Sequence, residues 1–222
     1  INEFDELVSA VTGTIVVHLA GIHGDKKVDP LEYTRVNVEG AQNIHRVCSL
    51  KNINKIIFMS SVAVYGVVDK KSYENTKTNP LSSYGQSKLE AEEELIKWDN
   101  SSTNNSLTII RSAPLFGKGG RGEVYNLFEQ IAKRRFLMIG NGKNKKSIAY
   151  VKNCAAFLEY CIDSKVKPGL YNYSDTPTLD MNNLVKIVMK QCYNSENVGF
   201  RVPYFLALII GYFADFLSII FR

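Results

Sequence analysis

The chain contains 222 residues, of which 45% are hydrophobic and 22% are charged, and its formal net charge at pH 7 is +5. A chain of this length and hydrophobic content can bury a substantial core, which excludes an intrinsically disordered protein. Its basic residues are scattered, so we expect no nucleic-acid partner. Its four cysteines lack a Cys-x-x-Cys spacing and its three histidines are scattered, so we expect no metal site and reduced thiols, as in a cytoplasmic protein.

The first half of the chain alternates between apolar runs and helical segments. We expect strands over residues 14–20, 55–61 and 107–113, and helices over residues 29–50 and 83–98. The sequence Asp-Pro-Leu-Glu at the start of the first helix supplies an N-cap, a proline at N1 and a glutamate at N3. Continuous apolar strands that alternate with helices predict an α/β fold with a doubly wound, parallel sheet.

The second half continues this alternation before it ends in an apolar tail. We expect helices over residues 123–134, 155–162 and 180–192, and strands over residues 147–151 and 169–173. The tail, residues 202–221, contains a single charge and is long enough to cross a bilayer. Because Pro203 and Gly211 interrupt it, we favour a packed helix or a helix on a membrane surface, and hence a possible peripheral membrane contact.

Tyr84 and Lys88 stand four residues apart on a predicted helix, and therefore share one of its faces. Ser60 and Ser61 end the preceding apolar strand, at the edge where parallel sheets carry their chemistry. A lysine ammonium beside a phenol favours its ionised form, so these residues form a candidate proton-transfer site. Strand-end caps for the serines and a solvated position for the lysine are the open alternatives. The outer face of the same helix is expected to be acidic, with Glu90, Glu92, Glu93 and Glu94.

The Tyr-x-x-x-Lys motif with its upstream serines resembles that of the extended short-chain dehydrogenase/reductase superfamily. Residues 60–66 are similar to its NAD-dependent epimerase/dehydratase branch, which includes UDP-glucose 4-epimerase-like nucleotide-sugar enzymes. Further segments match in the same order along the chain, over roughly residues 14–190. These are residues 18–21, 29–33, 37–40, 111–117, 140–142 and 147–153.

The resemblance implies a Rossmann-like fold with a small C-terminal substrate lobe. We expect residues 1–115 and 146–173 to form the NAD(P)-binding domain, and residues 116–145 and 174–222 to form the substrate-binding lobe. The family's first βαβ unit, which carries the glycine-rich pyrophosphate turn, is not matched by any segment of the chain. We therefore expect this sequence to be a fragment of a longer protein and to bind the dinucleotide poorly as it stands.

The resemblance also implies a role for each candidate residue. Tyr84 is the catalytic base at a sugar C4 hydroxyl, and Ser61 shares the same substrate oxygen. Lys88 lowers the pKa of Tyr84 and bonds the ribose of the cofactor, NAD or possibly NADP, which Tyr84 also contacts. The other residues expected to bind the cofactor are Leu19, Ala20, Gly21, Asn37, Ser60 and Pro114. For Asn37, a local structural hydrogen bond is the alternative role.

On the substrate side, the resemblance assigns Arg121 and Lys146 to the phosphates of a UDP-sugar. Relatives carry arginine where Lys146 stands, and lysine keeps the charge but loses the bidentate fork. Residues 117–122 also match the dinucleotide motif G-x-G-x-x-G. Because no acidic residue ends a strand about 20 residues later, we favour a substrate-side loop over a cofactor fingerprint.

Two departures from the family pattern narrow the expected reaction. Val62 and Ala63 stand where the related 4,6-dehydratases carry an Asp-Glu pair, so dehydration is not expected. Pro114 lies in a strand-end motif similar to that of bacterial surface-polysaccharide enzymes. The resemblance therefore implies an NAD(P)-dependent oxidoreductase or epimerase at C4 of a UDP-hexose, with N-acetylated hexoses favoured, in the synthesis of surface polysaccharide precursors.

Two other functions remain open at this point. An NADPH-dependent reductase of UDP-4-keto-sugars would use the same serine, tyrosine and lysine. A non-catalytic Rossmann-like binding protein would keep the sheet alone. The resemblance further implies a homodimer that forms through the helices near residues 30–50 and 83–98. The cysteines predict a cytoplasmic protein, and the apolar tail adds membrane association as an alternative.

Overall fold

The computed structural model describes residues 4–24, 28–68 and 71–209. The chain divides into two compact units, of which the first comprises Ile1–Gly117 with Ala149–Ser174 and the second comprises Lys118–Ile148 with Asp175–Arg222. Each unit contains its own cluster of buried apolar side chains. The roles given above to the two domains stay predictions.

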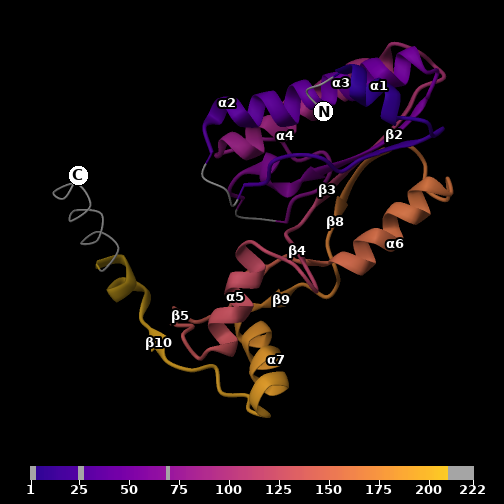
Figure 1. Ribbon diagram of the computed structural model, residues 1–222. Coiled ribbons are helices and arrows are strands. Elements are labelled where there is room, and N and C mark those ends of the chain that lie inside the picture. Colours follow the sequence, from indigo (N-terminus) through magenta and orange to yellow (C-terminus); the bar gives the residue numbers. More distant parts are fainter. Residues whose placement is uncertain (1–3, 25–27, 69–70, 210–222) are drawn as a thin grey trace. The chain divides into compact units, whose positions relative to one another are not determined.

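The first unit contains a four-stranded sheet in which every neighbouring pair of strands is parallel (Figure 1). The strands are β1 (Val16–His18), β2 (Lys55–Ser61), β3 (Ser106–Ser112) and β8 (Gly169–Tyr173), in the order β1-β2-β3-β8. The predicted α/β fold with a parallel sheet is confirmed. Strand β1 is shorter than the seven-residue strand expected from its apolar run.

Helices cover both faces of this sheet. Helices α3 (Glu39–Leu50) and α4 (Ser83–Asn100) lie on one face, and α6 (Val151–Ile162) lies on the other (Figure 1). Side chains of β2 alternate accordingly, because Ile56 and Phe58 join the cluster with α3 and α4 while Ile57 joins the cluster with α6. Sheet side chains on both faces are therefore buried, as a doubly wound fold requires.

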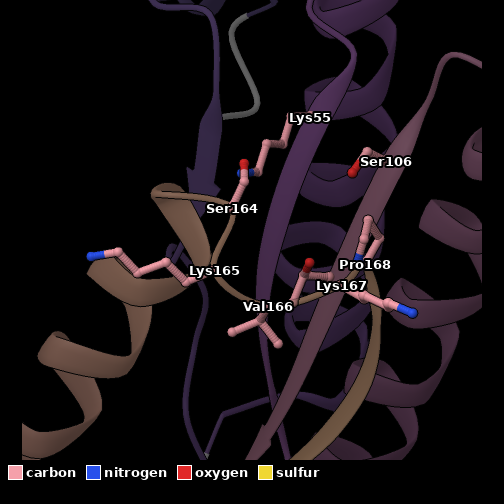
Figure 2. Close-up of a pocket in the computed structure, with 8 residues that line it drawn as sticks. Lys55, Ser106, Ser164, Lys165, Val166, Lys167 and Pro168 are labelled. Carbon is pink, nitrogen blue, oxygen red and sulfur yellow. The ribbon is translucent and has the colours of Figure 1, made fainter.

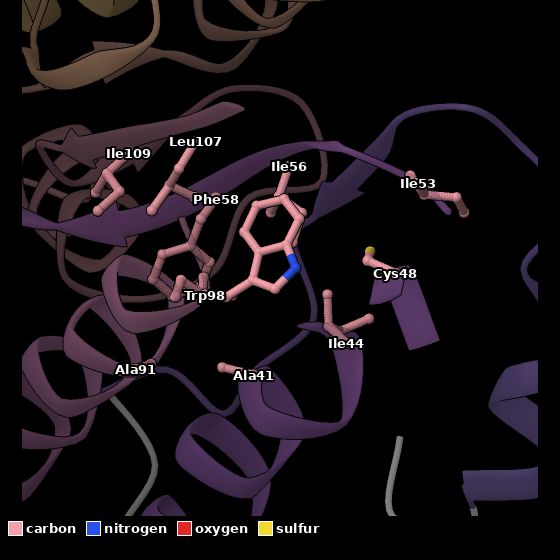
Figure 3. Packing of buried hydrophobic residues seen from close by; sticks show 11 residues of the cluster. Ala41, Ile44, Cys48, Ile53, Ile56, Phe58, Ala91, Trp98, Leu107 and Ile109 are labelled. Atoms are coloured by element: carbon pink, nitrogen blue, oxygen red, sulfur yellow. The ribbon is translucent and has the colours of Figure 1, made fainter. Parts of the chain in front are cut away.

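The core between the sheet and helices α3 and α4 is the larger apolar cluster of this unit. Figure 3 shows the indole of Trp98 among the side chains of strands β2 and β3 and of helices α3 and α4. Its buried members are Ala41, Ile44, Cys48, Ile53, Ile56, Phe58, Ala91, Leu95, Trp98, Leu107 and Ile109. Helix α1 (Phe4–Ala10) adds Leu7 to this cluster, although the sequence pattern did not predict this helix.

The expected helix over residues 29–50 is interrupted by a wider turn. Asp29 is the N-cap of helix α2 (Pro30–Tyr33). Its carboxylate accepts a hydrogen bond of 2.9 Å from the Leu31 amide, as the capping pattern predicts. A π-helical segment, Thr34–Val38, then joins α2 to α3. It contains Asn37, and π-helical turns are frequent at functional sites.

The second unit is built around two helices and short strand pairs. Helix α5 (Glu123–Ala132) and helix α7 (Met181–Tyr193) are amphipathic. Strand β5 (Met138–Ile139) pairs in parallel with β10 (Arg201–Val202), and β6 (Lys145–Lys146) pairs antiparallel with β9 (Leu179–Asp180). The buried residues of this unit's core are Ile131, Met138, Met181, Leu184 and Val185.

The described part of the apolar tail is helical over residues 204–209, and residues 210–222 of the predicted tail helix lie outside the described residues. Its large apolar side chains are exposed, as is Phe200 before it. They are Tyr204, Phe205, Leu206, Leu208 and Ile209. Within the part of the chain that the structure describes, no helix combines the length and the apolar character needed to cross a bilayer.

Candidate active site

The predicted catalytic residues meet at the carboxyl end of β2. Ser61 is the last residue of β2 and caps a short 3-10 helix, η2 (Val62–Tyr65), by accepting a 3.1 Å hydrogen bond from the Ala63 amide. Helix α4 begins beside this turn. A hydrogen bond links the side chains of Ser61 and Tyr84, so the structure brings these two predicted residues together.

The start of α4 places Tyr84 close to the strand end. Ser82 caps the helix and accepts a 3.1 Å hydrogen bond from the Gly85 amide. A β-carbon at Gly85 would lie 2.7 Å from the carbonyl oxygen of Ala63, so only glycine lets the helix approach η2 this closely. The sequence Ser-Ser-Tyr-Gly therefore provides both the cap and the close approach that position the phenol.

The environment of Tyr84 differs from the expectation that its pKa is lowered. Burial raises the pKa of the phenol above its usual value, because the phenolate form loses hydration. The hydrogen bond with Ser61 acts in the opposite direction, and the neighbouring Tyr33 acts with burial. Within the protein alone, burial is the larger effect, and Lys88 is not among the groups that shift this pKa.

Lys88 lies one helical turn after Tyr84 on the buried face of α4, which excludes the alternative of a solvated lysine. The residue is 7% exposed, and its ammonium lies 4.1 Å from the centroid of the Phe58 ring. Burial lowers the pKa of Lys88 to about 8, while the negative charge of Glu92 raises it. Lys88 is therefore mostly protonated at pH 7 and can supply a positive charge to the site.

His18, the last residue of β1, also contacts the Phe58 ring. Its imidazole stacks on Phe58 with ring centroids 5.2 Å apart, and the residue is 2% exposed. Its Nε2 atom has no hydrogen-bond partner within the described part of the chain. Burial, with a smaller contribution from Lys88, lowers its pKa to about 4, so His18 is neutral at pH 7.

Asn37 ties the loop after β1 to α4. Its side-chain oxygen accepts a 2.8 Å hydrogen bond from the Ile22 amide, and its side-chain nitrogen donates to the Ile22 carbonyl at 3.1 Å and to the Ser87 hydroxyl at 2.9 Å. A β-carbon at Gly21 would lie 2.8 Å from that side-chain oxygen, so glycine is needed for this approach. Asn37 thus has the structural role that was its alternative, and its role at the cofactor stays a prediction.

The remaining predicted cofactor residues of the first unit follow the carboxyl ends of β1 and β3. Leu19, Ala20 and Gly21 follow β1 and are exposed, with Leu19 at 57%. Pro114 follows β3, and its carbonyl accepts a 3.0 Å hydrogen bond from Ala149. An exposed apolar strand end with a glycine is a surface on which a flat ligand can lie.

The predicted phosphate-binding residues belong to the second unit. Arg121 is exposed in the loop before α5, and Lys146 forms an ion pair of 3.1 Å with Glu123. Their role as phosphate ligands stays a prediction. The dinucleotide fingerprint at residues 117–122 is not supported, because strand β4 (Leu115–Phe116) before it pairs with β7 (Ala149–Tyr150) outside the four-stranded sheet.

Two residues beside the candidate catalytic residues, Glu92 and Arg111, were not predicted as part of the site. Glu92 is 1% exposed, so its predicted place on a solvated acidic face is wrong. Its carboxylate accepts hydrogen bonds from the Ser60 hydroxyl and from the guanidinium of Arg111, whose terminal nitrogen is 2.6 Å away. The Ser60 hydroxyl therefore points to Glu92, and its predicted contact with the cofactor gains no support from this bond. An arginine inside an apolar strand was the available signal, because a buried charge requires a partner.

A separate cavity of about 270 Å³ lies at the opposite ends of the strands, beside the first residues of β2 and β3. The ammonium of Lys55 bonds the Cys161 and Ile162 carbonyls and the Ser164 hydroxyl. Figure 2 shows that Lys165 and Lys167 point away from each other. Because the candidate active site lies at the carboxyl end of β2, this cavity is distinct from it. The lysines of the cavity do not converge on a common point, so it is not built to hold an anion.

The fold and the site together define a Rossmann-like protein of the short-chain dehydrogenase/reductase type. The sequence matches the NAD dependent epimerase/dehydratase family over residues 1–173. The chain belongs to this family.

The curated relatives of the chain include several 4-epimerases. The N-acetyl-alpha-D-glucosaminyl-diphospho-ditrans,octacis-undecaprenol 4-epimerase of Escherichia coli O157:H7 is 43% identical over 206 residues, which cover 91% of this chain and 62% of that relative. The UDP-glucose 4-epimerase of Vibrio cholerae is 30% identical over 158 residues, covering 68% of this chain and 48% of the relative. The chain thus spans 62% of the length of the first relative and 48% of the length of the second.

Among solved structures, the UDP-glucuronic acid 4-epimerase from Bacillus cereus in complex with NAD is similar, with a TM-score of 0.75 and 19% identity. This match covers 90% of the chain and 66% of that structure. The UDP-Glc/GlcNAc 4-epimerase from Campylobacter jejuni has a TM-score of 0.74 and 17% identity, covering 91% and 69%. These likenesses confirm the Rossmann-like fold.

The buried, neutral His18 predicts a pH-dependent stability. Because its pKa is about 4 in the folded state and 6.5 in the reference state, the unfolded chain binds the extra proton, and stability falls as the pH decreases from about 6.5 to 4. The full difference between these two pKa values corresponds to a loss of about 3 kcal/mol in the free energy of unfolding. Urea unfolding of the wild type should show this loss between pH 7 and 4.5, whereas His18→Phe should lose less over the same interval.

The exposed His23 offers a matched control for this experiment. The variant His23→Gln is expected to lose as much stability between pH 7 and 4.5 as the wild type does. An equal pH-dependent loss in His18→Phe would contradict the assignment of this effect to His18.

Proposed function

We propose that the full-length protein is an NAD-dependent 4-epimerase. Its substrate is a hexose attached to a diphosphate carrier, and we favour an N-acetylated hexose. The hydrogen-bonded pair of Ser61 and Tyr84, with the buried ammonium of Lys88 one turn away, is the observation that supports this function. The relatives support the position of the reaction, because those described above act as 4-epimerases. The sugar is attached to diphospho-undecaprenol in the name of the first relative and to UDP in the name of the second. Both carriers present a diphosphate next to the sugar.

The residues present fit a nicotinamide dinucleotide. The exposed end of β1 offers Leu19, Ala20 and Gly21 as a floor, and the missing side chain at Gly21 lets the backbone lie against Asn37. Lys88 would bond the ribose. Such a cofactor, when bound, supplies the hydride acceptor and donor for the oxidation and reduction of C4.

The chain's own residues provide the proton transfer. Tyr84 removes the proton from the C4 hydroxyl and returns it after the sugar has turned over. Ser61 donates a hydrogen bond to the same substrate oxygen and steadies the keto form. Lys88 keeps its positive charge at pH 7 one helical turn after Tyr84, so this charge is available to a ligand bound beside the phenol. Val62 and Ala63 in η2 offer no acid for the elimination of water, so the sequence favours epimerisation over dehydration.

The variant Tyr84→Phe tests this mechanism in the full-length protein. It removes the proton-transfer oxygen and leaves the ring, so conversion of UDP-N-acetylglucosamine or of polyprenyl-diphospho-N-acetylglucosamine into the C4 epimer should fall by at least about 100-fold. Chromatography of the sugar conjugates after incubation with catalytic NAD measures the product. An unchanged urea midpoint shows that the variant is folded.

Two results would contradict the proposed function. Full turnover by Tyr84→Phe would exclude Tyr84 as the base. The wild type could instead reduce a 4-keto-sugar with stoichiometric NADPH and convert neither epimer into the other. This result would favour the reductase.

We further propose that the protein works at the cytoplasmic membrane surface through the exposed apolar residues near Phe200 and Tyr204–Ile209. Their exposure and the polyprenol-linked substrate of the Escherichia coli relative support this contact. The full-length protein should sediment with liposomes, and Phe205→Ser with Leu208→Ser should reduce the bound fraction severalfold. Equal sedimentation of both proteins would contradict the contact.

We also propose a homodimer that forms through the helices near residues 30–50 and 83–98. Exposed apolar side chains on these helices, among them Leu31, Leu50 and Ile96, support it. Sedimentation velocity should give twice the mass of the chain, and a monomer mass at micromolar concentration would contradict it.

A further inference from the structure

Side-chain alternation in β2 and β3 brings two polar residues together under α4. Ser60 and Arg111 are register partners in the parallel pair, and each stands two residues after an apolar residue, Phe58 or Ile109, that faces α3 and α4. Their side chains therefore point to the same face of the sheet as Phe58 and Ile109. On α4, the buried face runs through Lys88, Ala91, Glu92, Leu95 and Trp98, so Glu92 stands above both polar residues.

The side chains of Ser60, Glu92 and Arg111 form a network of hydrogen bonds in the core. Arg111 Nε lies 3.0 and 3.2 Å from the two carboxylate oxygens of Glu92, and a terminal nitrogen lies 2.6 Å from one of them. The Ser60 hydroxyl donates to the other oxygen. The remaining guanidinium nitrogen donates to the Tyr65 hydroxyl at 2.9 Å, and this hydroxyl donates to the side-chain oxygen of Asn172 at 2.7 Å.

This network is joined to the candidate catalytic residues at two points. Ser60 precedes Ser61 in the chain, so the bond between Ser60 and Glu92 holds the strand end that carries Ser61. Glu92 lies one turn after Lys88 on the same helix, and its charge acts on the ammonium of that lysine. A buried carboxylate is costly to desolvate, and the hydrogen bonds from Ser60 and Arg111 offset that cost here.

We propose that Glu92, held in place by Arg111, is a positioning residue that fixes the Ser61 strand end against α4 and keeps a negative charge facing Lys88. The proposal rests on the proposed function for the roles of Ser61, Tyr84 and Lys88. It gives the buried ion pair a task beyond stability, since two apolar residues would fill the same space at lower cost.

Charged and titratable groups from several elements surround Lys88. His18 from β1 contributes a neutral imidazole, and Arg111 from β3 contributes a positive charge that Glu92 neutralises. Tyr84 lies on α4 itself, and Tyr33 from α2 faces Tyr84 with ring centroids 6.2 Å apart. Loss of the Glu92 charge would leave Lys88 near an uncompensated guanidinium. Lys88 would then release its proton at a lower pH.

The test uses Glu92→Gln in the full-length protein, because glutamine keeps the shape of the side chain and removes its charge. The neighbouring Glu93→Gln is the matched control, since Glu93 is exposed on the same helix. Nitrogen-15 NMR of labelled lysine ammonium groups, with the Lys88 signal assigned by its loss in Lys88→Arg, follows the titration of Lys88 without any substrate. The pH dependence of kcat is measured in parallel.

We expect the pKa of Lys88 to fall by about one unit or more in Glu92→Gln and to stay at the wild-type value in Glu93→Gln. The pH profile of kcat should shift to lower pH, and kcat should decrease about tenfold or more with KM within about twofold. The same Lys88 pKa in all three proteins would overturn the proposal.

Two further measurements complete the test. If Glu92→Gln does not fold, Glu92→Asp replaces it, because aspartate keeps the charge but withdraws it by one methylene group. Its Lys88 pKa is expected below the wild-type value, and an unchanged value would overturn the proposal. Absence of epimerisation in the wild type would contradict the proposed function alone, because the lysine titration does not depend on turnover.

Discussion

The buried ion pair between Glu92 of α4 and Arg111 of β3 is the interaction on which the rest of the site depends. Two charges that are removed from water are tolerated only when their hydrogen bonds are nearly all satisfied, so the pair allows few alternative placements of the helix. With α4 held in this register, Tyr84 and Lys88 face the end of β2. Ser60, the second partner of Glu92, holds the neighbouring Ser61. The pair therefore links the packing of α4 on the sheet to the placement of the candidate catalytic residues.

Close backbone approaches provide the second constraint. Gly85 brings α4 against η2, and Gly21 brings the loop after β1 against Asn37, which in turn bonds Ser87 of α4. These contacts place an exposed strand end beside a buried phenol and a buried ammonium. Such an arrangement suits a proton transfer next to a flat ligand, and it accounts for the costly burial of Lys88.

Elements with strong local signals could be predicted from the sequence, whereas the buried polar contacts could not. Strands 55–61 and 169–173 were placed at their observed bounds, because a short run of apolar or aromatic residues lies between turn-forming segments in each case. The π-helical turn at Asn37 was missed, since the apolar spacing around it is that of an ordinary helix. Glu92 was assigned to solvent as one of four nearby glutamates, although Arg111 in an apolar strand already required a buried partner. The raised pKa of Tyr84 depends on burial, which a motif does not report.

The central claim is that the full-length protein inverts C4 of a diphosphate-linked hexose by removing and returning the hydrogen at that carbon, with Tyr84 moving the hydroxyl proton. The most direct measurement is to incubate UDP-N-acetylglucosamine, or its polyprenyl diphosphate counterpart, carrying deuterium at C4 with the protein in ordinary water. Mass spectrometry and NMR of the C4 epimer then locate the label. We expect the epimer to retain deuterium at C4. An epimer that carries solvent hydrogen at C4, or the absence of any epimer from both substrates, would contradict the account.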